Sequence, residues 1–142
     1  MFTSDHIHPM VAHFPVALII VGFLFEIFSL FFKKEACLSK TGFYLLEIGA
    51  LSVVVTYLSG VIFTEELTGP AHEVMETHEL FALLTMITMV VNALFRLWLI
   101  YKKKEETNLK WFAFSLYAIS TVLVGITGFF GGTLAYNYLM TV

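Results

Sequence analysis

Four long apolar stretches, separated by short polar connections, constrain the fold of this chain more than any other feature. They run over 9–32, 42–63, 70–101 and 111–134, and each has the roughly 20 residues that a helix needs to cross a hydrocarbon layer. Hydrophobic residues make up 58% of the chain and charged residues 13%, which leaves too few polar side chains to cover a soluble domain. The sequence predicts a single all-α domain over residues 1–142, an integral membrane bundle of four up-and-down helices.

The lysine and arginine residues indicate how this bundle is oriented. All eight lie at one end of the expected helices, in or beside the connections at 33–41 and 102–110. Basic connections stay on the cytoplasmic side of a membrane. We therefore expect a multi-pass protein of the bacterial cytoplasmic (inner) membrane with both termini on the periplasmic side. The periplasmic end is acidic, which favours a basic partner such as a periplasmic c-type cytochrome. Other membrane subunits and a quinone are further candidate partners.

The five histidines gather at the end that lacks basic residues. The stretch HIHPMVAHFP contains His6, His8 and His13 at the start of the first helix, and His72 and His78 lie at the start of the third. Because a helix turns by about 100° per residue, His8 and His13 point to different sides of the first helix. The two are therefore not expected to serve one site.

The two halves of the chain resemble each other. SVVVTYLSG at 52–60 matches STVLVGITG at 120–128, a Lys-Lys-Glu triplet follows the first helix of each half, and His13 aligns with His78. Such a repeat predicts two parallel helical hairpins related by an axis along the membrane normal. The first and third helices are then diagonal neighbours, so that His13 and His78 face each other.

Two imidazoles that face each other across a helix bundle are typical axial ligands of a b-type haem. We therefore predict one haem b between His13 and His78, with Phe14 packed against it and Gly60 and Gly128 leaving room for its ring. A second metal or haem site is a further candidate, made of His8, His72 and His6. The predicted function is electron transfer, by the protein alone or as a subunit.

Two other functions fit the same residues. Histidines among carboxylates suit a bare zinc, copper or iron ion, although neither His-Glu-x-x-His nor Glu-x-x-His occurs. Alternatively, the chain is a cofactor-free structural or assembly subunit whose histidines cap helices or form interfacial hydrogen bonds. No nucleophile–base pair, phosphate loop or nucleic-acid motif is present, so a stand-alone enzyme is disfavoured and nucleic acid is not an expected partner.

Three charged residues lie inside the apolar stretches near their basic ends. Glu26, Glu47 and Arg96 are each about one and a half turns from the basic end of their helices. A lone charge in the hydrocarbon region is costly. We therefore predict a structural ion pair in the bundle core between Arg96 and Glu26 or Glu47.

The stretch HPMVAHFPVAL at 8–18 resembles the H-P-x-x-V-H-F-P-I-A-L signature of a bacterial membrane family, catalogued as domain of unknown function 2231. Ala12 and Val16 replace the valine and isoleucine of that signature. The resemblance covers nearly the whole chain, including the histidine of the third helix and GFFGGTLAY near the end of the fourth. Members of that family often accompany genes for respiratory and c-type cytochromes, which implies by analogy a redox role in a respiratory chain. The positions that the resemblance carries over are His8, Pro9, His13, Phe14, Pro15, His78, Gly131 and Gly132.

Overall fold

The computed structural model describes residues 7–64 and 67–139 and confirms the helical prediction. The chain forms α1 (Ile7–Phe31), α2 (Ala36–Phe63), α3 (Pro70–Tyr101) and α4 (Leu109–Leu134), and α4 continues into a short π-helical turn, η2 (Ala135–Leu139). All four α-helices are long and apolar enough to cross a membrane. The protein is thus an all-α four-helix membrane bundle.

The helix boundaries extend beyond the apolar stretches at several ends. α2 begins at Ala36, whereas the apolar stretch begins at Gly42. The intervening residues include alanine, leucine and lysine, which favour helix. The backbone hydrogen bonds therefore continue past the part of α2 that lipid would surround. An apolar run marks the membrane-crossing part of a helix rather than its full length.

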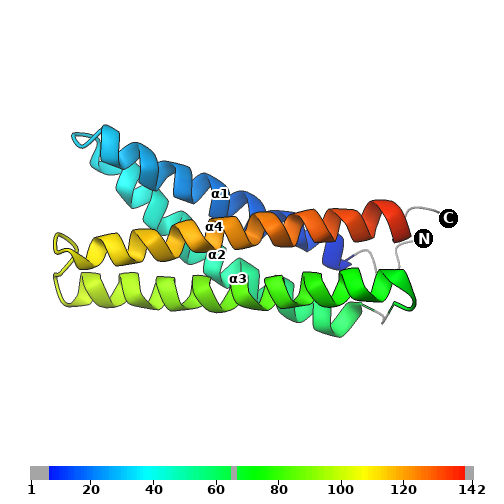
Figure 1. Cartoon of the computed structure of the whole chain (residues 1–142). Helices are drawn as coiled ribbons and strands as arrows, with labels where there is room; N and C mark the ends of the chain where they lie inside the picture. Colours follow the sequence, from blue (N-terminus) through cyan, green and yellow to red (C-terminus); the bar gives the residue numbers. More distant parts are fainter. Residues whose placement is uncertain (1–6, 65–66, 140–142) are drawn as a thin grey trace.

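The four helices form two hairpins. α1 packs along α2, and α3 packs along α4. The α1–α2 hairpin crosses the α3–α4 hairpin at an angle, and the two diverge toward the connections at 32–35 and 102–108 (Figure 1). The start of α1 and the end of α4 lie together at the opposite end of the bundle (Figure 1). Contacts between α2 and α3 and between α1 and α4 close the ring, so α1 and α3 are diagonal.

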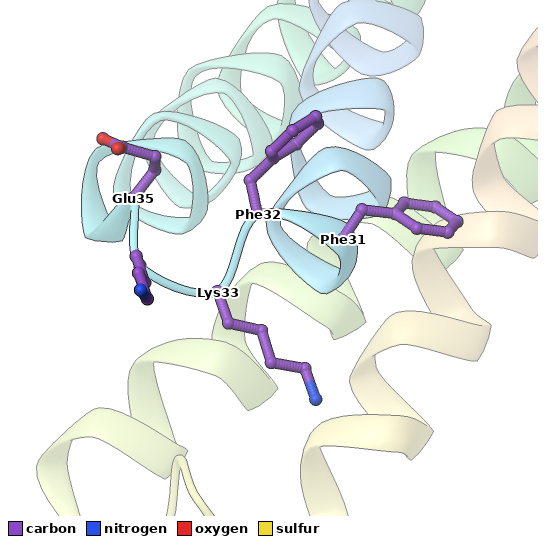
Figure 2. A pocket seen from close by; sticks show the side chains of 5 residues that line it. Phe31, Phe32, Lys33 and Glu35 are labelled. Carbon is purple, nitrogen blue, oxygen red and sulfur yellow. The ribbon is translucent and has the colours of Figure 1, made fainter.

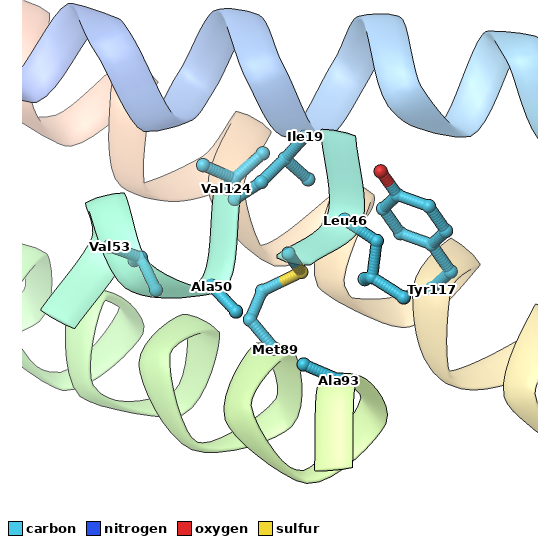
Figure 3. Close-up of a cluster of buried hydrophobic side chains, with 8 residues drawn as sticks. All are labelled: Ile19, Leu46, Ala50, Val53, Met89, Ala93, Tyr117 and Val124. Atoms are coloured by element: carbon cyan, nitrogen blue, oxygen red, sulfur yellow. The ribbon is translucent and has the colours of Figure 1, made fainter. Parts of the chain in front are cut away.

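The core lies where the two hairpins cross. Ile19 of α1, Leu46 of α2 and Met89 of α3 are completely buried there. Figure 3 shows how these side chains fill the centre together with neighbours from α2, α3 and α4, namely Ala50, Val53, Ala93, Tyr117 and Val124. Small and large side chains alternate in this cluster, which lets helices approach closely in a membrane bundle.

The outer faces of the helices are apolar. Leu51, Leu94 and Val122 are 71%, 62% and 63% exposed, which would be costly in water and suits contact with lipid chains. Tyr101 near the basic connections and Tyr136 at the other end are also exposed, as expected for aromatic side chains at the two membrane–water interfaces. A lipid bilayer is therefore the natural surrounding of this bundle.

α1 continues through Pro15, a buried proline inside the helix. Proline has no N–H, so the carbonyl of Val11 loses the donor that a regular helix would provide. The hydroxyl of Thr56 on α2 donates to this carbonyl oxygen at 3.5 Å. A neighbouring helix thus satisfies the freed backbone group, as a membrane interior requires.

Residues of the two hairpins that are 70 positions apart in the sequence lie together in the bundle. Glu26 and Arg96, which contact each other, are 70 positions apart. The same separation relates Ile19 to Met89, the central buried residues of α1 and α3. The two Lys-Lys-Glu triplets in the sequence have the same separation of 70 positions.

The connection between α1 and α2 carries an open hollow at the basic end of the bundle, lined by Phe31, Phe32, Lys33, Lys34 and Glu35. Figure 2 shows that the labelled side chains spread away from one another. Because they do not converge on a common point, this hollow builds no ligand site.

Candidate functional site

Two histidines meet between the hairpins at the end opposite the basic connections. His8 lies near the start of α1 and His78 lies on the diagonal helix α3. Their ring centroids are 6.3 Å apart, and the ring planes are inclined by 80°. Both side chains are partly buried. We call these two residues the histidine pair.

Each imidazole of the pair is held through its Nδ1 atom. The Nδ1 of His78 lies 3.0 Å from the carbonyl oxygen of Thr127 on α4, and since a carbonyl only accepts, this Nδ1 carries the proton. The Nδ1 of His8 lies 3.0 Å from the hydroxyl oxygen of Ser59 on α2, and the backbone of Thr56 also interacts with this imidazole. Nδ1 of each imidazole thus has a hydrogen-bond partner. When Nδ1 carries the proton, Nε2 of the same ring keeps the lone pair that can bind a metal.

Two glycines give the imidazoles their space. A Cβ atom at Gly60 of α2 would lie 3.0 Å from Cε1 of His8, and one at Gly131 of α4 would lie 3.1 Å from Cε1 of His78. Real Cβ contacts are rarely this short, so any side chain at either position would press on the imidazole. Gly60 was predicted to leave room for a cofactor ring, and it leaves room for the imidazole of His8. Gly131 has the corresponding role for His78 in the second hairpin.

A valine at position 131 tests this close fit. We expect Gly131→Val to displace the imidazole of His78 and to cost about 1–3 kcal/mol of unfolding free energy, the usual range for overpacking a filled site. Gly128→Val is the matched control, because a Cβ atom at Gly128 meets nothing within 4 Å. Unfolding of both variants in detergent checks this. An equal loss of unfolding free energy in the two variants would show that Gly131 does not provide the space for the imidazole of His78.

Burial affects the charge of His8. It lowers the pKa of His8 below the ordinary value of 6.5, and the positive charge that His78 can carry lowers it further, while the hydrogen bond to the backbone of Thr56 acts in the opposite direction. The neutral imidazole is therefore favoured at neutral pH. A metal ligand needs this neutral form.

The structure brings His8, and not His13, to His78. His13 is exposed on α1, and its neighbour Phe14 is 63% exposed. Five residues along a helix rotate the side chain by about 140°, so the helix that directs His8 toward the axis directs His13 away from it. The expected approach of His13 to His78, and of Phe14 to the same site, is thus corrected.

Two further predicted site residues, Gly128 and His72, do not join the pair. Gly128 borders a shallow hollow on the outside of α4 with Tyr136. His72 is exposed and lies 3.4 Å from Glu76 on its own helix, so it does not combine with His8 into a second site. His6 lies outside the described residues.

Sequence reasoning missed the groups that hold the two imidazoles. Thr56 and Thr127 each precede, by one helical turn, the glycine that packs against a histidine. The pattern Thr-x-x-x-Gly at 56–60 thus has a counterpart at 127–131 in the second hairpin, where it also occurs at 121–125.

Close to His78, Phe81 of α3 stacks on Phe130 of α4 with ring centroids 6.0 Å apart. These rings place flat apolar surface beside the pair.

The pair offers two imidazole donors, which is the number of axial ligands that a bis-histidine haem uses. Among residues 7–64 and 67–139, no three His, Cys, Asp or Glu side chains gather to hold a metal ion, whereas structural zinc takes four protein ligands. Haem brings its own equatorial nitrogens and needs only axial ligands. The rings of His8 and His78 pack edge to face with centroids 6.3 Å apart, and two imidazoles bound on opposite sides of one metal would have ring centroids roughly 6 Å apart.

A second polar group lies toward the basic end of the bundle. The Nη2 atom of Arg96 on α3 donates to Oε1 of Glu26 on α1 at 2.7 Å, and the two side chains are only 18% and 9% exposed. Glu47 of α2 lies within electrostatic reach of Arg96. Arg96 thus pairs with Glu26, whereas Oε1 of Glu47 is buried without a hydrogen-bond partner.

Fold and site together define a four-helix membrane protein with a histidine pair near one end and a buried ion pair toward the other. Residues 4–142 match the family model described as "Predicted membrane protein (DUF2231)", and the chain belongs to this family. The resemblance in the sequence is thereby confirmed. No curated protein and no solved structure matches the chain.

Proposed function

We propose that this chain is a membrane-embedded b-type cytochrome, or the cytochrome subunit of a larger complex, in which His8 and His78 are the axial haem ligands. The observation that carries the proposal is the histidine pair, with ring centroids 6.3 Å apart on diagonal helices. The ligands replace the combination of His13 and His78 expected from the sequence. One haem b per chain is the proposed stoichiometry.

The residues around the pair would fix and shield the ligands. The Thr127 carbonyl holds the His78 ring in one tautomer, and Ser59 orients the ring of His8. Such partners orient metal-binding imidazoles and strengthen them as ligands. When bound, haem would supply one-electron transfer, with a potential tuned by the two imidazoles and the apolar surroundings.

The charge distribution supports electron exchange at the periplasmic side. The pair lies at the end of the bundle opposite the basic connections, and exposed Glu73, Glu76 and Glu79 lie near it on α3. Basic connections favour the cytoplasm, and an acidic surface attracts a basic partner. A periplasmic c-type cytochrome is the proposed soluble partner, and a quinone or another membrane subunit of the respiratory chain is the proposed partner within the membrane.

The single cysteine offers a direct test of this orientation. Cys37 is exposed at the start of α2, beside the basic connection. We expect a membrane-impermeant maleimide to label Cys37 in inverted membrane vesicles and not in right-side-out vesicles. A Thr68→Cys variant in a Cys37→Ser background, with its thiol at the opposite end of the bundle, should show the reverse. Labelling of Cys37 in right-side-out vesicles would place the histidine pair on the cytoplasmic side.

Titration with haemin tests the proposed ligation. Purified protein in detergent, freed of any haem, is titrated with haemin and followed by the absorbance of the bound form. We expect saturation at one haem per chain, and no such saturation in a His8→Ala/His78→Ala double variant. A folded protein that does not take up haemin would contradict the proposal. If that protein instead binds zinc, copper or iron, a bare-ion function is favoured, and if it binds none of these, a structural or assembly role is favoured.

A further inference from the structure

A second polar cluster lies toward the basic end of the bundle, and the histidine pair does not account for it. Each helix contributes one ionisable side chain to this inner cluster, which we define as Glu26 of α1, Glu47 of α2, Arg96 of α3 and Tyr117 of α4. The membrane-crossing segments of all four helices include these positions. The cluster therefore lies in a region where an unbalanced charge is costly.

The charges of the inner cluster do not balance if both carboxyl groups are ionised. Arg96 forms a charge-assisted hydrogen bond of 2.7 Å with Glu26, and its positive charge acts on Glu47 without forming an ion pair with it. Among the described residues, no other lysine or arginine lies within ion-pair distance of Glu47. The lysines of the connections at 33–34 and 102–104 are exposed. If both carboxyl groups were ionised, two negative charges would thus share the single positive charge of Arg96.

The hydrogen bonds of Glu47 lead to the same conclusion. Its Oε1 atom is buried and has no hydrogen-bond partner. Glu47 is half-buried, and a negative charge on a carboxyl group with one oxygen shielded from water and without a donor is disfavoured relative to the neutral acid. The neutral acid needs only one proton to remove that charge.

Further polar atoms around the cluster are also unpartnered. The side-chain amide of Asn92, which is completely buried, lies one turn before Arg96 on α3 and has no partner for either polar atom. The hydroxyl of Tyr117 is buried and unpartnered as well, and it points toward α1 (Figure 3). It packs against the backbone at Gly22, where any Cβ would overlap it. The Tyr117 hydroxyl, which interacts with Glu26 and Arg96, thus has no hydrogen-bond partner that fixes its direction.

We propose that Glu47 binds an exchangeable proton at neutral pH and that the inner cluster is a proton-binding site of this membrane protein. In the binding step the Glu47 carboxylate takes a proton from a hydronium ion and leaves water, and the reverse step returns the proton. The charged group that acts on Glu47 is Arg96 of α3, and Arg96 in turn interacts with Glu26 of α1 and Tyr117 of α4. Buried carboxyl groups in membrane helices commonly serve in proton relays.

Infrared spectroscopy of the protein in lipid vesicles at neutral pH tests this proposal. A protonated carboxyl group has a C=O stretch that a carboxylate lacks, and this band shifts when water is exchanged for D₂O. We expect the band in the wild type, its loss in Glu47→Gln, and its retention in Glu79→Gln, which removes an exposed carboxyl group of α3. Arg96→Met should roughly double the band, because Glu26 then also takes up a proton.

Two outcomes would overturn the assignment. The first is a wild-type protein without a protonated carboxyl band, a result that requires no variant to fold. The second is a band that persists unchanged in Glu47→Gln. If Glu47→Gln does not fold, Glu47→Asp provides the second variant, since the band should then move rather than vanish. None of these measurements requires haem, so their outcome is independent of the haemin titration.

Discussion

His78→Ala and His8→Ala should each abolish haem binding, whereas His13→Ala should leave it intact. His8 and His78 are the two imidazoles that meet between the hairpins, and His13 is exposed on another side of α1. Removing an axial ligand should cost more than the roughly 10–100-fold in affinity that outer-shell partners of metal ligands cost. The measurement is the haem content of each variant purified from the same membranes.

His13→Ala is the decisive comparison, because the sequence alone favours His13 over His8. All three variants lose an imidazole from the same end of the bundle, so a general loss of stability would affect them alike. Circular dichroism shows whether each variant keeps its helices. If His13→Ala lost haem while His8→Ala kept it, the pairing of His8 with His78 would not be the functional one.

Arg96→Met should be the most destabilising single change at the inner cluster. It leaves the buried carboxyl group of Glu26 without its partner, and breaking a buried pair in this way costs about 3–5 kcal/mol. Protonation removes the unpaired charge of Glu26. The loss of unfolding free energy should therefore be largest at neutral pH and should become smaller as the pH falls. Unfolding of the detergent-solubilised protein at several pH values measures the effect.

Two controls separate this effect from a general change of charge. Lys110→Met removes an exposed pair with Glu106 and should cost less than about 1 kcal/mol. The double variant Glu26→Gln/Arg96→Met removes both charges and should recover much of the loss, because no unpaired charge remains. Similar small losses for Arg96→Met and Lys110→Met would show that the Arg96–Glu26 contact does not stabilise the bundle.

The sequence predicted the fold well because the membrane imposes few solutions. Apolar runs of sufficient length must become helices, since every backbone group has to be satisfied internally. The same reasoning led to the partner of Arg96: a guanidinium in an apolar run needs a carboxyl group, and only Glu26 and Glu47 lie at a matching depth. The structure shows that Glu26 is that partner.

Helix periodicity alone could not show which histidine of α1 lies beside His78. Periodicity places His8 and His13 on different faces of α1, but it does not say which face points toward α3. The alignment of the two halves decides this. The separation of 70 positions between Glu26 and Arg96 also separates His8 from His78. The Lys-Lys-Glu triplets have this separation too, so the correct alignment of the two halves was present in the sequence. The more conspicuous segments at 52–60 and 120–128, which both end in glycine, favoured a different alignment.

The optical spectrum of the protein purified from its native membranes tests the central proposal most directly. It is recorded after oxidation in air and again after reduction with dithionite. Ligation by His8 and His78 predicts a Soret band that sharpens on reduction, together with resolved α and β bands typical of bis-histidine haem b. A folded protein whose spectrum shows no such bands in either state would contradict the assignment of this chain as a cytochrome.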